Sequence, residues 1–237
     1  MLKSAYVMAM RTLSVPLRGI GILARLERAP RASMRFWIAS QFAIYDVAAL
    51  MRLDVPWWTF PAIDRIERWI AARNGDVRAF EYGSGASTAW LARRCRQVDS
   101  VEHDAAFARA TASLLALDNV RLRVIEPQRT RDIPIAGSGR SGYEDCDFAA
   151  YVDSIADSGQ RYDLIVIDGR ARASCLLRAQ GCLADGGLVV FDNSNRRRYQ
   201  GALAGTAART MRCRGLAPAL PYRSETALIG YEEASSP

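Results

Sequence analysis

Histidine is nearly absent from this 237-residue sequence, which contains only His103. Its cysteines form no C-x-x-C pair and are odd in number, at positions 95, 146, 175, 182 and 213. A single histidine and unpaired cysteines argue against a zinc site, and the odd count argues against a disulfide framework. We therefore expect a reducing location such as the cytoplasm.

Long hydrophobic runs are also missing. Residues 1–26 faintly resemble a signal peptide, but Arg11, Pro16 and Arg18 interrupt the apolar run and no A-x-A-like site closes it cleanly. Residues 36–51 are too few to span a bilayer and include an aspartate. The sequence predicts no transmembrane helix.

Arginine, by contrast, is abundant. All but one of the 32 basic residues are arginine, and the formal net charge is +7. Half of the residues are hydrophobic and 24% are charged, so the chain can bury a core and is not expected to be disordered. Residues 1–76 carry 11 basic and 6 acidic side chains. This surplus favours an anionic surface or partner, although a solvated helical surface explains it equally.

The sequence divides into two regions. Residues 1–76 look helical, with breaks at Pro30 and at the Pro56/Pro61 pair. A helix is expected over 62–73, where the apolar residues fall on one face at helical spacing. We therefore expect a helical cap or arm over residues 1–76 and a second domain over 77–237.

The second region alternates short strands with helices. Strands are expected at 77–82, 98–102, 120–125, 164–167 and 188–191, and helices at 105–115, 171–183 and 196–212. This alternation predicts parallel pairing through right-handed crossovers, and hence a doubly wound α/β sheet. Two further strands, 216–220 and 226–231, predict a final antiparallel hairpin.

One connection, residues 126–162, is unusually long and contains GSGRSG at 137–142. Connections of this length are usually functional or disordered. The glycines fit a flexible linker or lid, or alternatively an anion-binding loop.

A glycine-containing turn is the strongest signal in the sequence. In the segment FEYGSGASTAWLARR, a strand runs into Gly83-Ser84-Gly85 and a helix starts at once. Glycine lets the backbone adopt a positive φ and approach a ligand closely. The start of the helix offers free N–H groups, with Ser87 or Thr88 as its cap.

An acid follows at the expected end of the second strand. Glu102 can accept hydrogen bonds from both ribose hydroxyls of an adenosine cofactor. An ordinary strand-to-helix turn followed by a surface glutamate would produce the same sequence pattern. The neighbouring His103 is a tempting general base, but we expect it to shape the adenosine pocket or to have no role.

More acids stand at the ends of later strands. The fourth strand ends in Asp168 and the fifth in Asp192, and the carboxyl ends of parallel strands are where functional groups collect. Arg170 and Arg172 either contact an anionic acceptor or pair with these acids. Arg196-Arg197-Arg198 either grips phosphate or forms a solvated helix face.

These features resemble the class I S-adenosylmethionine-dependent methyltransferases over about residues 77–231. The glycine turn, the strand-two acid, YDLIVIDG, LADGG and the final hairpin all match. Within the class, the chain looks most like small bacterial proteins with EYGSG-x-ST, DGR-x-R and DNS motifs. The resemblance implies a mostly parallel seven-stranded sheet whose last strand is antiparallel.

The resemblance also implies which residues bind the cofactor. Glu81, Gly83 and Gly85 would contact the methionine end of S-adenosylmethionine, and Glu102 its ribose. Ser84, Ser87 and His103 would complete this site. Ser87 stands where many relatives have a third glycine.

A further similarity, to catechol-type O-methyltransferases, concerns metal. Those enzymes hold Mg²⁺ with an aspartate after strand four and an Asp-Asn pair after strand five, and Asp168, Asp192 and Asn193 match these places. Mg²⁺ would bind and acidify an acceptor hydroxyl. A structural Asp-Asn-Ser turn explains the same residues. Asp168 would then be the leading general base.

The sequence thus predicts an S-adenosylmethionine-dependent methyltransferase that O-methylates a small molecule or a glycoconjugate precursor. The alternatives are an aminopropyltransferase-like enzyme and a non-catalytic protein that binds cofactor, or an anionic membrane surface through residues 1–52. Nucleic acid is disfavoured as a substrate, because the chain has no N/D-P-P-Y/F motif and no Pro-Cys pair. The N-terminal helices are expected to cover the active edge or to form a homodimer.

Overall fold

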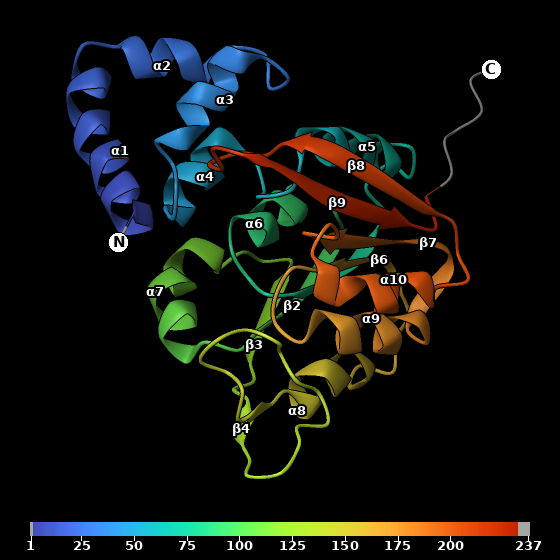
Figure 1. Cartoon of the computed structure of the whole chain (residues 1–237). Helices are drawn as coiled ribbons and strands as arrows, with labels where there is room; N and C mark the ends of the chain where they lie inside the picture. The colour runs from blue at the N-terminus through green and yellow to red at the C-terminus, as the bar shows by residue number, and fades with distance from the viewer. Residues whose placement is uncertain (1, 232–237) are drawn as a thin grey trace.

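A computed structural model of the chain describes residues 2–231 and contains a seven-stranded sheet (Figure 1). The strand order is β3-β2-β1-β6-β7-β9-β8. The first five of these strands are parallel, and β9 runs antiparallel to both of its neighbours. The strands are β1 Arg78–Tyr82, β2 Gln97–Glu102, β3 Val120–Val124, β6 Tyr162–Ile167, β7 Leu183–Asp192, β8 Thr210–Leu216 and β9 Arg223–Ile229. The predicted doubly wound sheet is confirmed.

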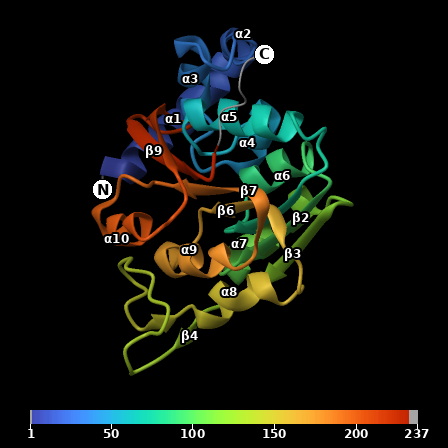
Figure 2. The same cartoon turned by 90° about the vertical axis from the view of Figure 1, so that its right-hand side faces the viewer.

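Helices cover both faces of the sheet (Figure 2). Alternate strand residues face opposite sides, so Ala79 joins one core and Phe80 the other. The first core is covered by α5 Phe60–Ala71 and α6 Ala86–Ala92, with α7 Ala105–Leu115 beside α6 and β3. The second core is covered by α8 Ala149–Asp153, α9 Arg172–Gln180 and α10 Gln200–Ala204.

The predicted hairpin exists, but its first strand was placed wrongly. Residues 216–220 lie mostly in the turn, and β8 begins at Thr210, inside the predicted helix 196–212. That segment contains only a 3₁₀ turn, Arg197–Tyr199, followed by α10, which ends at Ala204. In β8, Cys213 is buried while its arginine neighbours are exposed. This period of two is the strand signal that the arginine content obscured.

The long connection 126–162 has secondary structure of its own. Its strands β4 Gln128–Arg129 and β5 Cys146–Asp147 pair antiparallel, and α8 and the 3₁₀ turn Ser154–Ala156 follow. The connection is therefore an ordered excursion beside the sheet rather than a bare linker.

The N-terminal region is helical, as predicted. It contains α1 Leu2–Gly19, α2 Ile22–Glu27, α3 Met34–Gln41 and α4 Val47–Leu53. Phe36 and Leu50 share a small core with Ala86 at the start of α6 and Ala219 in the β8–β9 turn. Trp37 Nε1 also donates a hydrogen bond to the Leu220 carbonyl oxygen at 3.1 Å. The region is thus docked on the sheet edge where α6 begins.

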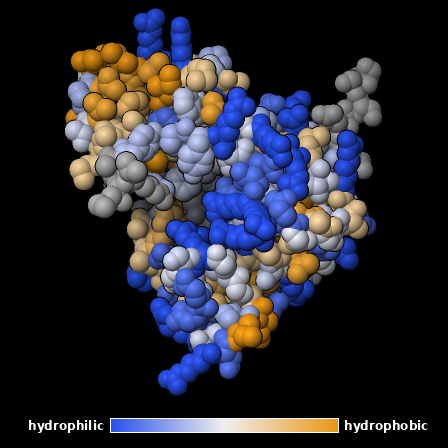
Figure 3. Space-filling view, in the orientation of Figure 1, coloured by the Kyte–Doolittle hydropathy of each residue, from blue (hydrophilic) through white to orange (hydrophobic). Residues whose placement is uncertain are grey.

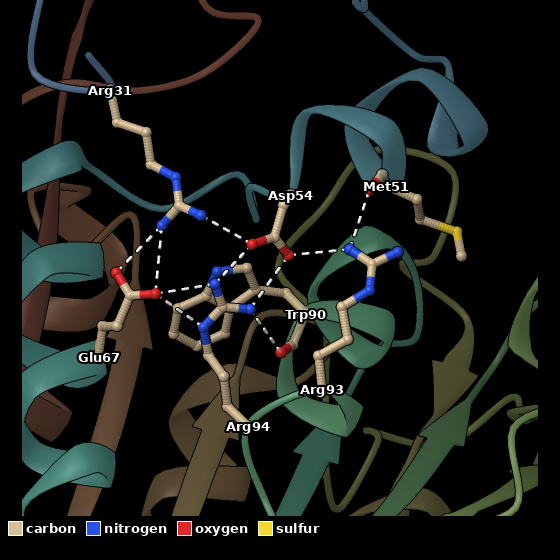
Figure 4. Close-up of polar contacts among 7 residues, drawn as sticks. All are labelled: Arg31, Met51, Asp54, Glu67, Trp90, Arg93 and Arg94. Carbon is tan, nitrogen blue, oxygen red and sulfur yellow. Dashed lines mark hydrogen bonds and ion pairs between the residues drawn. The ribbon is translucent and has the colours of Figure 1, made fainter. Parts of the chain in front are cut away.

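An ion-pair network strengthens this docking (Figure 4). Asp54, which ends α4, accepts from Arg31 at 2.7 Å, Arg93 at 2.8 Å and Arg94 at 2.6 Å, and Arg94 lies over the ring of Trp90. Burial raises the pKa of Asp54, but the hydrogen bonds from Arg94 and Arg93 outweigh it and leave the pKa below its usual value. The network joins α4 to the C-terminal end of α6.

The boundary predicted at residue 76 divides the chain by composition. In sequence, α5 precedes this boundary. In the structure, however, it packs into the core of the sheet through Ile63, Ile66 and Ile70. Independent folding of residues 1–76 and 77–237 stays a prediction. Over residues 2–231, none of the helices combines the length and apolarity needed to cross a membrane.

Candidate functional site

A cavity of about 590 Å³ opens at the carboxyl ends of β1, β2, β6 and β7. The glycine turn and Glu102 line one part, and the ends of β6 and β7 line another. The N-terminal region supplies an apolar wall made of Ile44, Tyr45, Val47, Leu50 and Trp57. The predicted covering of this edge by the N-terminal helices therefore matches the lining of the cavity.

The glycine turn brings two strand ends close together. Gly83 has a φ of +97°, and a Cβ placed there would lie 2.7 Å from the Cα of Gly169. A Cβ on Gly85 would meet no protein atom within 4 Å. Only glycine therefore fits at position 83. Gly85 lines the cavity, and the space beside it is open.

Glu81 lies beneath this turn, fully buried. Its carboxylate accepts hydrogen bonds from the hydroxyls of Ser87 and Thr88, both at 2.5 Å, and of Ser100 at 3.0 Å. Burial raises the pKa of Glu81 to about 7, although these hydrogen bonds lower it. Ser87 lines the cavity, whereas Glu81 is not among the lining residues. The direct cofactor contact of Glu81 stays a prediction.

Glu102 does line the cavity, and it is held by a set of donors. One carboxylate oxygen accepts from the backbone N–H groups of His103 and Asp104 at 2.7 and 2.9 Å, and the other accepts from Ser84 N and Oγ at 3.0 and 3.2 Å. Burial raises the pKa of Glu102, but His103 and these N–H groups keep it below its usual value. The carboxylate is therefore ionised and fixed in orientation.

His103 is placed where the sequence predicts, next to Glu102. Its Nδ1 lies 2.6 Å from the Glu102 carboxylate, and its ring packs near Tyr143, Phe148 and Tyr151. This aromatic setting suits the predicted role in shaping the pocket.

The acids after β6 and β7 meet at a buried arginine. Arg172 Nη2 lies 2.6 Å from Asp168 Oδ1, and Nη1 lies 3.6 Å from Asp192 Oδ2. The same guanidinium donates to the carbonyl oxygens of Gly169 at 3.1 Å and Asp192 at 2.5 Å. Of the two alternatives for Arg172, pairing with the acids is the one that the structure shows.

The predicted magnesium site does not fit this arrangement. Asn193 does point at Asp192, but its amide donates to Asp192 Oδ2 at 2.5 Å, and Thr226 donates to Oδ1 at 2.9 Å. The cationic Arg172 lies where a second cation would have to bind both carboxylates. Within residues 2–231 no group of three or more His, Cys, Asp or Glu side chains could hold a metal ion. The metal assignment of Asp168, Asp192 and Asn193 is therefore not supported.

Burial of Asp192 also affects its pKa. Desolvation and the nearby charge of Asp168 raise its pKa, although Arg172 and Thr226 lower it. Both carboxylates line the cavity, and the Asp168 side chain is the more exposed of the two, so Asp168 remains the carboxylate best placed to meet an acceptor.

Several lining residues were missed from the sequence. Tyr45, Phe107 and Tyr222 reach the cavity from segments far apart in the chain. No local pattern marks these three residues, because only tertiary packing brings them to the cavity. Arg140 belongs to the GSGRSG segment, for which an anion-binding loop was one of the alternatives.

Comparison with solved structures identifies the fold. The chain is similar to a Staphylococcus aureus protein provisionally assigned as a caffeoyl-CoA O-methyltransferase, with a TM-score of 0.50, 13% identity and coverage of 78% of this chain and 92% of that one. It is also similar to a methyltransferase-like protein from Silicibacter pomeroyi (TM-score 0.47, 21% identity, coverage 74% and 90%). A methyltransferase from Geobacter sulfurreducens gives a TM-score of 0.46, 17% identity and coverage of 89% and 96%.

At these identities the similarity extends to the fold alone. The chain has the α/β fold of class I S-adenosylmethionine-dependent methyltransferases. No protein-family model matches the sequence, and no curated protein matches it either.

Proposed function

We propose that this chain is an S-adenosylmethionine-dependent methyltransferase that O-methylates a small molecule or a glycoconjugate precursor. One observation carries the proposal. The ionised, buried carboxylate of Glu102 and the open side of Gly85 line the same cavity as Asp168. A cofactor site and a polar group able to meet an acceptor are thus joined in one space.

The cavity residues fit the proposed cofactor. Glu102 offers a fixed, charged acceptor for two ribose hydroxyls, and such charge-assisted hydrogen bonds are strong. The absence of a side chain at Gly85 leaves room for close approach of a ligand to the backbone. S-adenosylmethionine, when bound, would supply an electrophilic methyl group on a sulfonium.

The remaining catalytic work would be done by positioning and by a base. Asp168 would accept the proton of the acceptor hydroxyl, and Arg172, 2.6 Å away, would hold its carboxylate in place. The apolar wall that includes Leu50 and Trp57 would exclude water from the reacting groups. No step in this scheme passes through a metal.

The test is acceptor screening with labelled methyl on the cofactor. Transfer of label to a hydroxyl compound, lost in Asp168→Asn while cofactor binding survives, is the expected result. Release of methylthioadenosine instead would identify the aminopropyltransferase-like alternative. Cofactor binding without transfer to any acceptor would favour the non-catalytic alternative.

We propose in addition that the N-terminal helices contact an anionic membrane surface. Figure 3 shows hydrophobic side chains over the region of α1, α2 and α3. The large apolar side chains on or beside these helices that are more than 40% exposed are Met8, Leu13, Val15, Ile20, Ile22, Met34 and Ile38. The exposed Arg25, Arg28 and Arg35 lie among them in sequence. Apolar and cationic groups together favour an interface of acyl chains and anionic headgroups.

Vesicle flotation tests this second proposal. Full-length protein should float with vesicles that contain phosphatidylserine and not with neutral ones, and Ile20→Asp with Val15→Asp should abolish flotation. A dimer in sedimentation that these same changes dissociate, without flotation, would assign the surface to a second copy of the chain instead.

A further inference from the structure

The positive charge around the cavity falls into two groups. Arg172 is saturated by Asp168, Asp192 and backbone carbonyl oxygens. Four other arginines line the cavity without forming an ion pair to any acid of residues 2–231: Arg140, Arg170, Arg196 and Arg198. The cavity lining therefore carries four guanidinium groups that no acid of the described residues pairs with.

Arg170 is the most enclosed member of this group. Its Nε is buried and makes no hydrogen bond to the described residues, and its guanidinium lies 5.4 Å from the centre of the Tyr143 ring. Burial and the neighbouring charge of Arg140 lower the pKa of Arg170. A half-buried cation beside other cations is costly for a protein to keep without an anionic partner.

The four arginines come from three segments that are fastened together. Arg198 Nη1 donates to the Gly139 carbonyl oxygen at 2.9 Å, which ties the segment after β7 to the GSGRSG loop that carries Arg140. Arg198 also lies 5.0 Å from the centre of the Tyr199 ring. Figure 3 shows strongly hydrophilic side chains gathered near the middle of this face, by the segment that leads into α10.

Another part of the cavity lining is apolar. Ile44, Leu50 and Trp57 come from the N-terminal region, and Leu220 and Tyr222 come from the β8–β9 turn. A ligand that fills the cavity would therefore meet both an apolar, partly aromatic surface and guanidinium groups. Guanidinium groups bind carboxylate and phosphate oxygens through paired, charge-assisted hydrogen bonds.

We infer that the methyl acceptor carries an acidic group, a carboxylate or a phosphate, on an apolar or aromatic body, and that Arg140, Arg170, Arg196 and Arg198 bind this group. The inference rests on the proposed function, because it assigns the acceptor half of the same cavity. Asp168 lines the same cavity as these arginines, so the acceptor that they bind would also meet the proposed base. A neutral phenol or sugar would leave the four arginines without an anion.

Calorimetry on the full chain tests this with three probes of similar size: benzoate, phenyl phosphate and phenol. Each is titrated with and without saturating S-adenosylhomocysteine. At least one acidic probe should bind saturably and phenol should bind at least about tenfold more weakly. The tighter of benzoate and phenyl phosphate identifies the acid as carboxylate or phosphate.

Matched variants locate the binding. Arg170→Gln with Arg196→Gln should weaken the acidic probe by about tenfold or more, and the exposed Arg196→Gln alone should weaken it by less. Arg209→Gln removes one charge, as Arg196→Gln does, from an exposed position outside the cavity and should not change the binding of the acidic probe. Phenol that binds as tightly as both acids, or acid binding that is unchanged in the double variant, would overturn the inference.

The two proposals fail in different ways. Wild-type protein that binds an acidic probe at the arginines but does not bind S-adenosylhomocysteine would contradict the methyltransferase and leave the anion site standing. Protein that binds S-adenosylhomocysteine but neither acid would contradict the anion site and leave the proposed methyltransferase standing.

Discussion

The two halves of the cavity treat charge in opposite ways. In the cofactor half, Glu102 is matched by backbone N–H groups and by Ser84, so its charge is satisfied within the protein. In the acceptor half, Arg170 and Arg196 have no acidic partner among the described residues. The carboxylate of the first half is held in place before any ligand binds, whereas the arginines of the second half would gain their counter-ion from the ligand.

Arg172 lies where the halves meet, and it belongs to the fold. We expect Arg172→Met to lower the free energy of unfolding by about 3–5 kcal/mol, because Asp168 and Asp192 would be left without their counter-ion. Arg178→Met is the matched control on the same helix, since Arg178 pairs with Asp153 at an exposed site and should cost no more than about 1 kcal/mol. Urea unfolding measures both.

Equal losses in these two variants would show that Arg172 is not the buried counter-ion described above. The distinction between Arg172 and the other cavity arginines would then fail, since Arg172 would also be available to the acceptor.

The pH dependence of stability tests the environment of Glu81, which lies beneath the glycine turn. Its pKa of about 7 in the folded state lies above its usual value of 4.5, so the folded state keeps a proton that the unfolded state loses in this range. Stability should therefore fall as pH rises from about 4.5 to about 7, by roughly 3 kcal/mol, and change no further from this group above pH 7.

Glu81→Gln should remove this part of the pH dependence. Burial also raises the pKa of Asp192, which adds to the fall in both proteins, so the difference between wild type and variant isolates Glu81. Thermal unfolding from pH 4.5 to 8 measures the two curves. Parallel curves over that range would mean that Glu81 is ionised in the fold and is matched like Glu102.

The halves also differ in how far the sequence predicts them. The glycine turn, the helix start and Glu102 lie within one strand-turn-helix-strand unit, whose geometry follows from local sequence. The acceptor half gathers Trp57, Arg140 and Tyr222 from distant segments, and only tertiary packing decides that they meet. The sheet and its order of elements could be predicted because they too follow from the local alternation of strands and helices.

The errors have physical causes. The Asp-Asn pair after β7 fits a metal-binding pattern, but a buried guanidinium four residues after Asp168 neutralises both carboxylates. In β8 the buried Cys213 lies between the exposed Arg212 and Arg214, yet these arginines extend the helical appearance of the preceding segment.

The central claim is that the cofactor half binds an adenosine cofactor through Glu102. Calorimetry with S-adenosylhomocysteine should show saturable binding to wild type. Binding to Glu102→Ala should be weaker by about 1–3 kcal/mol, because charge-assisted hydrogen bonds to the ribose are lost. Thermal unfolding of the variant checks that the fold is retained, and Arg209→Gln should bind as wild type does. No binding to wild type, or an equal dissociation constant in a folded Glu102→Ala protein, would contradict the claim.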